Sequence, residues 1–193
     1  MNGRKQSSNI RHILHVIVPF LCALTLASTS SAQIKWSSIS EASKSEVGQM
    51  MYLVDFYTSW CGYCKKMDRQ TFTDPVVSAI VNAYYYPVKF NAESEPVFSW
   101  NGVQYQMTTG GSRGVHQFAQ AILGRQMGFP SFAIFRPDRS LIQVIPGYYP
   151  PADFARLLWY FASGDYERYA YGEYVKIFDT RIRPEMMKQL KMN

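Results

Sequence analysis

The chain has 193 residues, of which 47% are hydrophobic and 18% are charged. This composition fits one globular domain and excludes both a large multidomain assembly and an intrinsically disordered chain. The three cysteines, Cys22, Cys61 and Cys64, are too few for a small scaffold held together by disulfides. Three histidines in the whole chain also argue against a histidine-rich metal site.

Residues 1–32 have the order of segments that is typical of a secretory signal peptide. Basic residues without acidic ones come first, and the apolar run 13–27 follows, which contains Pro19 and is short for a bilayer span. Ser30 and Ala32 then occupy the positions that a signal peptidase reads. We therefore predict cleavage after Ala32, a periplasmic or secreted mature protein and no stable membrane insertion; an uncleaved anchor is the alternative.

Removal of residues 1–32 changes the charge and the cysteine content. The chain loses three basic residues and no acidic ones, so its formal net charge falls from +6 to +3. A charge of +3 gives no indication of nucleic-acid binding, and we expect no nucleic-acid partner. The exported chain keeps only Cys61 and Cys64, in a compartment where thiols are not kept reduced by default.

The first half of the mature chain predicts alternating strands and helices. In chain order we expect a strand or lead-in over 34–40, a polar helix over 41–48, a strand over 50–57, helices over 61–71 and 74–83, and a strand over 84–91. The run 50–57 is apolar, β-branched and aromatic, which predicts a buried strand. Asp74 and Pro75 are typical of a helix cap and first turn.

The second half predicts a late hairpin and further helices. In chain order we expect an irregular segment over 92–111, a helix from the cap Ser112 to Leu123, strands over 131–135 and 141–145 around a turn, a helix over 151–162, and helical stretches over 165–190 that divide near Arg183-Pro184. Together these elements predict an α/β fold with a mixed central sheet and helices on both of its faces.

The segment Trp60-Cys61-Gly62-Tyr63-Cys64 follows a predicted buried strand and opens a helix. Free backbone N–H groups and the positive end of the helix dipole favour a thiolate at Cys61, and Lys65 and Lys66 add positive charge. A thiolate is the nucleophile of disulfide exchange. We therefore expect Cys61 to be exposed and to attack, and Cys64 to be shielded and to resolve the mixed disulfide.

Three other uses of the cysteine pair stay open at this point. A zinc site needs four ligands, but the mature chain offers Cys61, Cys64 and His116 without a second pair. An iron–sulfur site would have to be shared between subunits. A structural disulfide would stabilise little, because the loop that it closes is so short. We expect no metal and no cofactor besides the Cys61–Cys64 disulfide.

The segment VDFYTSWCGYCKKM, residues 54–67, resembles the active-site segment of the thioredoxin superfamily. The resemblance extends in order over about residues 50–162 and implies a thioredoxin-like fold. It also implies that Asp55 is the buried acid that moves the proton of the resolving cysteine, and that Lys89 pairs with this acid. Alternatively, Asp55 ends its strand and Lys89 is an outward-facing strand residue.

The same resemblance implies a substrate-binding surface around the disulfide. Residues 128–131 match the family's loop that carries a cis-proline, here Pro130, and Gly147 matches the glycine of the substrate-facing loop. The residues expected to border the thiol and contact substrate are Trp60, Gly62, Tyr63, Phe129, Pro130 and Gly147. Trp60 and Tyr63 could instead be ordinary surface aromatics.

The chain departs from compact thioredoxins in two segments. The connection before the proline loop is lengthened by an insertion over about 92–126, in which a small hairpin around Gly102 is one option. A C-terminal extension covers about 164–193. Both features resemble thioredoxin-like proteins exported by some bacteria. We predict a structural role for His116, and core-covering roles for Tyr166, Tyr169, Tyr174 and Phe178.

The function that the sequence favours is an exported thiol–disulfide oxidoreductase that acts on cysteine-containing protein substrates. Its dithiol carries two electrons. We favour a reductase, which receives its electrons from a membrane electron donor, over an oxidant. The alternatives are a thioredoxin-fold binding module whose disulfide is structural, and a protein that delivers metal through the cysteine pair.

Overall fold

The computed structural model describes residues 33–46, 48–108 and 114–192. The predicted signal peptide, residues 1–32, and the predicted helix cap Ser112 lie outside these residues. Within the described part of the chain, no helix is both long and apolar enough to cross a membrane.

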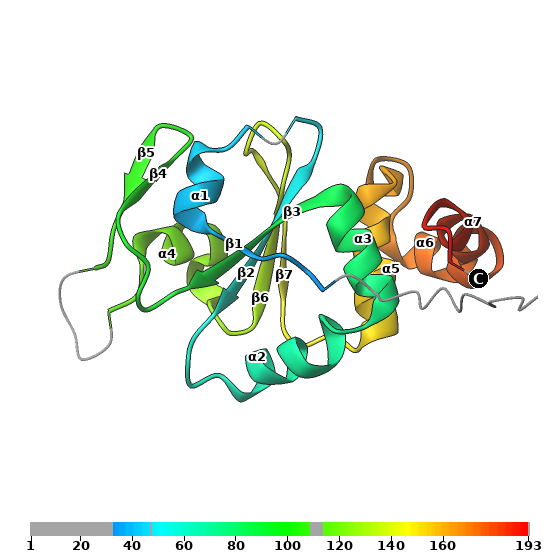
Figure 1. The fold of residues 1–193 in the computed structure, drawn as a ribbon, viewed down its shortest axis with the longest axis horizontal. Coiled ribbons are helices and arrows are strands. Elements are labelled where there is room, and N and C mark those ends of the chain that lie inside the picture. The colour runs from blue at the N-terminus through cyan, green and yellow to red at the C-terminus, as the bar shows by residue number, and fades with distance from the viewer. Residues whose placement is uncertain (1–32, 47, 109–113, 193) are drawn as a thin grey trace, which may run out of the picture. The chain divides into compact units, whose positions relative to one another are not determined.

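A five-stranded mixed sheet forms the centre of the fold (Figure 1). Its strand order is β1-β3-β2-β6-β7, with β1 at Ser37–Ser38, β2 at Met51–Tyr57, β3 at Tyr85–Asn91, β6 at Ser131–Phe135 and β7 at Leu141–Pro146. β2 runs parallel to β3, whereas β6 runs antiparallel to both of its neighbours. The predicted mixed sheet is therefore confirmed, and β2 and β6 are apolar runs because both of their faces are covered.

Helices cover both faces of the sheet, with α1 and α4 on one side and α3 and α5 on the other (Figure 1). Their bounds are Ile39–Lys44 for α1, Pro75–Tyr84 for α3, Gln117–Leu123 for α4 and Pro151–Ala162 for α5. As predicted, Asp74 caps α3: its Oδ1 accepts the backbone N–H groups of Val76 and Val77 at 2.9 and 3.1 Å.

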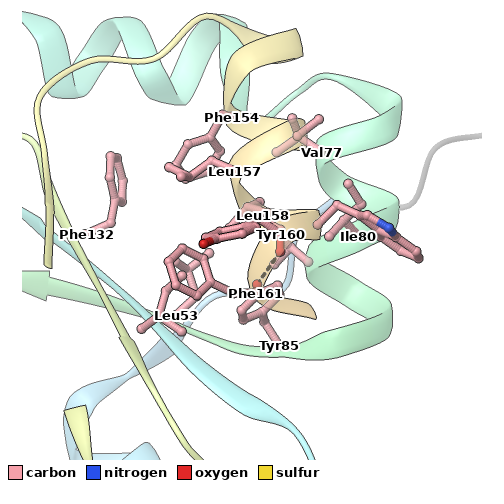
Figure 2. Packing of buried hydrophobic residues seen from close by; sticks show 14 of the residues in the cluster. Leu53, Val77, Ile80, Tyr85, Phe132, Phe154, Leu157, Leu158, Tyr160 and Phe161 are labelled. Carbon is pink, nitrogen blue, oxygen red and sulfur yellow. Dashed lines mark hydrogen bonds between the residues drawn. The ribbon is translucent and has the colours of Figure 1, made fainter. Parts of the chain in front are cut away.

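One apolar layer lies between the sheet and helices α3 and α5 (Figure 2). Leu53 from β2 and Phe132 from β6 lie on the sheet side, and Phe154 and Leu158 come from α5. Tyr85, at the start of β3, is fully buried and donates its hydroxyl hydrogen to the carbonyl oxygen of Leu158 at 2.6 Å. This hydrogen bond satisfies the hydroxyl, so the ring can pack in the core without an unpaired polar group.

The opposite face of the sheet is covered largely by aromatic rings. The ring of Phe118, in α4, lies 5.7 Å from that of Phe56 in β2, 5.4 Å from that of Phe90 in β3 and 6.2 Å from that of Phe135 in β6, measured between centroids. Rings at these separations contribute beyond their buried area. The second half of the insertion is therefore held on the sheet by its own core residues.

The insertion contains the small hairpin considered around Gly102. Strands β4 (Phe98–Trp100) and β5 (Val103–Tyr105) pair antiparallel across Asn101-Gly102. The φ angles are positive at both residues, 50° at Asn101 and 76° at Gly102. An Asn-Gly pair is favoured in such a turn, because asparagine tolerates a positive φ and glycine adopts it without strain. The prediction of an irregular segment over 92–111 is therefore wrong at this hairpin.

The predicted start of the next helix is wrong. A helix from Ser112 was expected, but α4 begins at Gln117, because His116 serves as its cap. The Nδ1 atom of His116 accepts the backbone N–H of Phe118 at 3.2 Å, and Nε2 lies 3.2 Å from the carbonyl oxygen of Pro96. The fully buried ring thus joins the two halves of the insertion, and its role is structural.

The first elements are also displaced from their predicted bounds. The strand predicted over 34–40 is limited to Ser37–Ser38, and α1 begins at Ile39 and ends at Lys44 rather than spanning 41–48. A capping box sets this start: Ser38 Oγ accepts the N–H of Glu41 at 3.2 Å, and Glu41 Oε2 accepts the N–H of Ser38 at 2.8 Å.

The C-terminal extension contributes to the main core. Its helices are α6 (Tyr171–Ile177), a π-helical segment (Phe178–Ile182) and α7 (Arg183–Gln189). Tyr174 is fully buried and donates its hydroxyl hydrogen to the carbonyl oxygen of Arg156 in α5 at 3.3 Å. Phe178 and Met186 are buried in the same apolar cluster as the residues of α5. The extension is therefore packed against α5 as an integral part of the domain.

Tyr174→Ala should lower the free energy of unfolding by about 3–5 kcal/mol, because the change removes a fully buried ring and leaves a cavity. Urea unfolding followed by circular dichroism measures the loss. Lys176→Ala, on the exposed side of the same helix, is the control and should change the free energy by less than about 0.5 kcal/mol. Equal losses in the two variants would contradict the integral role of the extension.

Candidate active site

The two cysteines lie at the junction between β2 and the helix that follows it. After β2 ends at Tyr57, the backbone N–H of Cys61 donates to the carbonyl oxygen of Thr58 at 3.2 Å, which closes a turn. The helix then runs through α2 (Gly62–Lys66) and a π-helical segment, η1 (Met67–Thr71). The helix predicted over 61–71 is therefore confirmed.

Cys61 and Cys64 form a disulfide, with their Cα atoms 5.3 Å apart. Cys61 is also the cap of α2, and its Sγ accepts the backbone N–H of Cys64 at 3.0 Å. A backbone N–H directed at sulfur in the first turn of a helix stabilises negative charge there. When the disulfide is reduced, this arrangement favours the thiolate at Cys61.

The expectation that Cys61 is exposed is wrong for this disulfide form. Its relative exposure is 4%, and that of Cys64 is 3%. The physical reason is that the Cys61 sulfur is bonded to Cys64 and turned over the first turn of α2, where it accepts the backbone N–H of Cys64. The exposed groups of the motif are instead Trp60 and Tyr63, which are 59% and 63% exposed.

Trp60 is connected to two segments that follow much later in the chain. Its indole N–H lies 3.0 Å from each carboxylate oxygen of Glu93, at the start of the insertion. Its ring also meets the ring of Phe129 edge-on, with the centroids 6.4 Å apart. The insertion therefore reaches the rim of the cysteine site and places a carboxylate there.

The proline loop reaches the same end of β2 through the register of β6. Because Ser131 pairs with Phe56, Pro130 comes to lie near the end of β2, from which the chain leads to Cys61. The Phe129–Pro130 peptide bond is cis. The carbonyl oxygen of Pro130 accepts the backbone N–H of Gly147 at 2.8 Å, and Gly147 has a φ of 95°, which favours glycine.

Asp55 and Lys89 form a partly buried ion pair between neighbouring strands. They are register partners in β2 and β3, and Lys89 Nζ lies 2.6 Å from Asp55 Oδ2. Lys89 also binds Asp68 Oδ1, in η1, at 2.5 Å. Asp55 is almost fully buried, whereas the Asp68 side chain is 46% exposed. One ammonium group therefore joins a buried carboxylate to one that solvent reaches.

Burial dominates the electrostatics of Asp55. Removal from water raises its pKa to about 6, although the charge and hydrogen bond of Lys89 act in the opposite direction. Its second oxygen, Oδ1, has no hydrogen-bond partner among the described residues. Asp55 is therefore a carboxyl group that can gain or lose a proton near neutral pH, with one oxygen available for a further interaction.

Aromatic rings surround the ammonium group of Lys89. Its Nζ lies 4.8 Å from the ring centroid of Trp36, 5.2 Å from that of Tyr57 and 4.9 Å from that of Phe72. Burial by itself lowers the pKa of Lys89, but Asp55 and Asp68 outweigh burial and raise it. Lys89 therefore stays charged over the range in which Asp55 titrates.

The structure brings together the predicted site residues in three groups: the two cysteines, the Asp55–Lys89 pair, and the rim of aromatic and loop residues. Sequence reasoning missed Asp68 and Glu93. Asp68 is four residues after Cys64 on the same helical segment, which is the one signal that could have suggested it. The contact of Glu93 with Trp60 has no local signal, because 33 residues separate them.

Within the described residues, no group of three or more His, Cys, Asp or Glu side chains is placed to hold a metal ion.

Residues 39–162 match the family model of the thioredoxin-like domain, which is more than half of the chain. The chain belongs to this thioredoxin-like family. Its fold is a thioredoxin-like α/β fold with a central mixed sheet, helices on both faces and a C-terminal helical region.

Solved structures with similarity to this chain include three bacterial proteins. A thioredoxin from Thermus thermophilus is 20% identical, with 66% of this chain and 85% of that chain covered and a TM-score of 0.47. A thioredoxin-fold protein from Helicobacter pylori is 17% identical, with 74% and 81% covered and a TM-score of 0.42. The reduced C-terminal domain of DsbD from Neisseria meningitidis is 21% identical, with 62% and 87% covered and a TM-score of 0.38. No curated protein matches the sequence.

The raised pKa of Asp55 predicts a pH-dependent effect of Asp55→Asn on stability. The folded protein holds this proton up to about pH 6, whereas the unfolded chain releases it near pH 3.8. The protonated Asp55 therefore contributes to the free energy of unfolding of the wild type at low pH, and this contribution is lost as the pH rises from about 4 to about 6. Relative to wild type, Asp55→Asn should gain about 3 kcal/mol in free energy of unfolding across this range.

Urea unfolding of both oxidised proteins between pH 4 and pH 8 measures this difference. Glu173→Gln, which removes an exposed carboxyl group from α6, is the control. If the difference between wild type and Asp55→Asn stays constant over the whole range, Asp55 does not titrate as burial predicts.

Proposed function

We propose that this protein is a thiol–disulfide oxidoreductase that exchanges disulfides with cysteine-containing protein substrates through Cys61 and Cys64. The observation that carries the proposal is the Cys61 sulfur at the first turn of α2, where it accepts the backbone N–H of Cys64 in a disulfide with that residue. A structural cross-link requires no such placement, whereas a nucleophilic thiolate is stabilised by it.

In the first step the Cys61 thiolate attacks one sulfur of the substrate disulfide. A Cys61–substrate bond forms, the substrate S–S bond breaks, and the released substrate thiolate takes a proton from solvent. The electron pair for the new bond comes from Cys61. Because the thiolate fraction of Cys61 controls this step, the N–H group of Cys64 and the nearby lysines support it.

In the second step Cys64 attacks the Cys61 sulfur. The Cys61–Cys64 disulfide forms, the mixed disulfide breaks, and the second substrate thiolate leaves. The thiol proton of Cys64 has to be removed before this attack. We assign its removal to Asp55, whose pKa of about 6 suits a base near neutrality and whose Oδ1 is unpaired among the described residues. Lys89 positions this carboxylate.

We assign substrate binding to the rim of the disulfide. Trp60 and Tyr63 are exposed beside it, and the loops of Pro130 and Gly147 meet at the same end of β2. Backbone groups of such loops suit an extended substrate segment. The side chains and loops in this role are those of Trp60, Gly62, Tyr63, Phe129, Pro130 and Gly147.

We propose that the protein acts as a reductase outside the cytoplasm. The signal-peptide pattern of residues 1–32 supports export. Asp55 supports the direction of reduction, because it assists the attack of Cys64 that releases reduced substrate. A reductase in an oxidising compartment needs a dithiol donor that returns two electrons to the pair. We propose a membrane protein for this role.

Cys61→Ser should abolish the reduction of insulin by dithiothreitol that the wild type catalyses, because the attacking sulfur is lost. Cys64→Ser should instead accumulate a Cys61–substrate mixed disulfide, which is visible on a non-reducing gel and disappears on reduction. Ser163→Ala, far from the cysteines in the chain, is a control for handling and should retain activity. Wild-type activity in Cys61→Ser would reject the proposed function.

The reduction potential of the Cys61–Cys64 pair tests the direction of the reaction. Equilibration with dithiothreitol or glutathione should give a value near the reducing end of the family range, about −270 mV. A value near the oxidising end, about −120 mV, would mean that the protein donates disulfides rather than removing them.

A further inference from the structure

A hollow of about 340 Å³ opens on the helical segment that follows Cys61. It is lined by Gly62, Tyr63, Lys66, Arg69 and Gln70. Gly62 directly follows Cys61 in the chain, so the hollow begins beside the disulfide. A substrate that binds in it would lie next to the sulfur atoms that exchange.

The charge around this hollow is positive. Lys66 and Arg69 are three residues apart on one helical segment, so they share a face of it. Among residues 33–46, 48–108 and 114–192, neither of them is within 4.0 Å of a carboxylate oxygen, and neither is Lys65. The single acidic residue of the segment, Asp68, is bound to Lys89.

Tyr63, which lines the hollow, packs against Tyr148, which contacts two further lining residues. Tyr63 is 63% exposed, and its ring centroid lies 5.9 Å from that of Tyr148. Lys66 Nζ lies 4.3 Å from the centroid of the Tyr148 ring, and the Tyr148 hydroxyl donates to Gln70 Oε1 at 3.1 Å. Lys66 is thus held by an aromatic ring, and its charge stays available to an anion.

At Trp60, which lies on the other side of Cys61 in the chain from Tyr63, the charge is negative. The carboxylate of Glu93 binds the indole N–H of Trp60 there, and no cation lies within 4.0 Å of it among the described residues. A substrate segment that crosses the disulfide therefore meets positive charge on the Tyr63 side and negative charge on the Trp60 side. Such an arrangement selects the orientation of a charged partner.

We propose that Lys65, Lys66 and Arg69, around the Tyr63–Tyr148 pair, bind an acidic segment of the protein substrate on one side of its reacting cysteine. We call these three residues the basic face. The proposal rests on the proposed function, because it names a substrate class for that reaction. Asp or Glu side chains of the substrate pair with Lys66 and Arg69, and Glu93 repels acidic residues from the opposite side.

The test uses reduced protein and cysteine peptides that are joined to 2-mercaptoethanol through a disulfide. The peptides differ only in two residues on one side of the cysteine, Glu-Glu or Gln-Gln, and each pair is made in both orientations. At low ionic strength, one orientation of the Glu peptide should react roughly tenfold faster than its Gln partner. The ratio should approach one in high salt, because salt screens exposed charges.

Two variants locate the effect. In K66E/R69E the Glu peptide should react more slowly than the Gln peptide, and in K66Q/R69Q the ratio of the two rates should fall towards one. K176E/R181E makes the same change in net charge on exposed residues of the C-terminal extension and should keep the wild-type ratio. A wild-type ratio near one, or equal effects of K66E/R69E and K176E/R181E, would overturn the proposal.

A binding measurement separates this proposal from the proposed function. Peptides with serine in place of cysteine cannot exchange disulfides, so their affinity for the oxidised protein reports docking alone. Isothermal titration should show at least fivefold tighter binding of the Glu peptide than of the Gln peptide, and equal affinities would overturn the docking proposal. A protein that reacts with no disulfide but prefers the Glu peptide would refute the proposed function and leave the basic face supported.

Discussion

The hydrogen-bonded pairing of β2 on both of its edges is the constraint on which the candidate site depends. Its parallel register with β3 places Asp55 opposite Lys89, and its antiparallel register with β6 brings Pro130 to the end at which Cys61 follows. A shift of one residue in either register would turn these side chains to the other face of the sheet. The apolar residues of β2 therefore fix the position of the reactive groups as well as the core.

The same strand carries a carboxyl group that is costly to bury. Most buried acids in proteins are paired, and a desolvated carboxylate reduces stability unless its partners compensate for the lost water. Lys89 compensates in part, yet burial still raises the pKa of Asp55 to about 6. A polar site that weakens the fold in this way is typical of functional sites, where a titratable group is needed in a place with little water.

The additions to the domain differ in how they relate to the site. The C-terminal extension buries Tyr174 and Phe178 against α5 and contributes to the core. The insertion packs on the other face of the sheet through Phe118 and also reaches the disulfide rim, where Glu93 binds Trp60. The extension therefore acts on stability, whereas the insertion also changes the charge of the surface that a substrate would meet.

The amino-acid sequence by itself determined those features that depend on neighbours in the chain. The apolar run of β2, the cap Asp74 and the strand–cysteine–helix motif can be predicted because hydrophobic periodicity and helix caps involve only a few consecutive residues. Together they predicted the mixed sheet, the helices on both of its faces and the two central site residues, Cys61 and Cys64.

The tertiary structure decided what depends on segments far apart in the chain. The second carboxylate on Lys89 and the contact of Glu93 with Trp60 were not predictable, because each depends on how separate elements meet. The start of α4 has the same cause, since the His116 cap is held by a carbonyl group twenty residues earlier. Local sequence patterns carry no information on such contacts, and packing alone selects them.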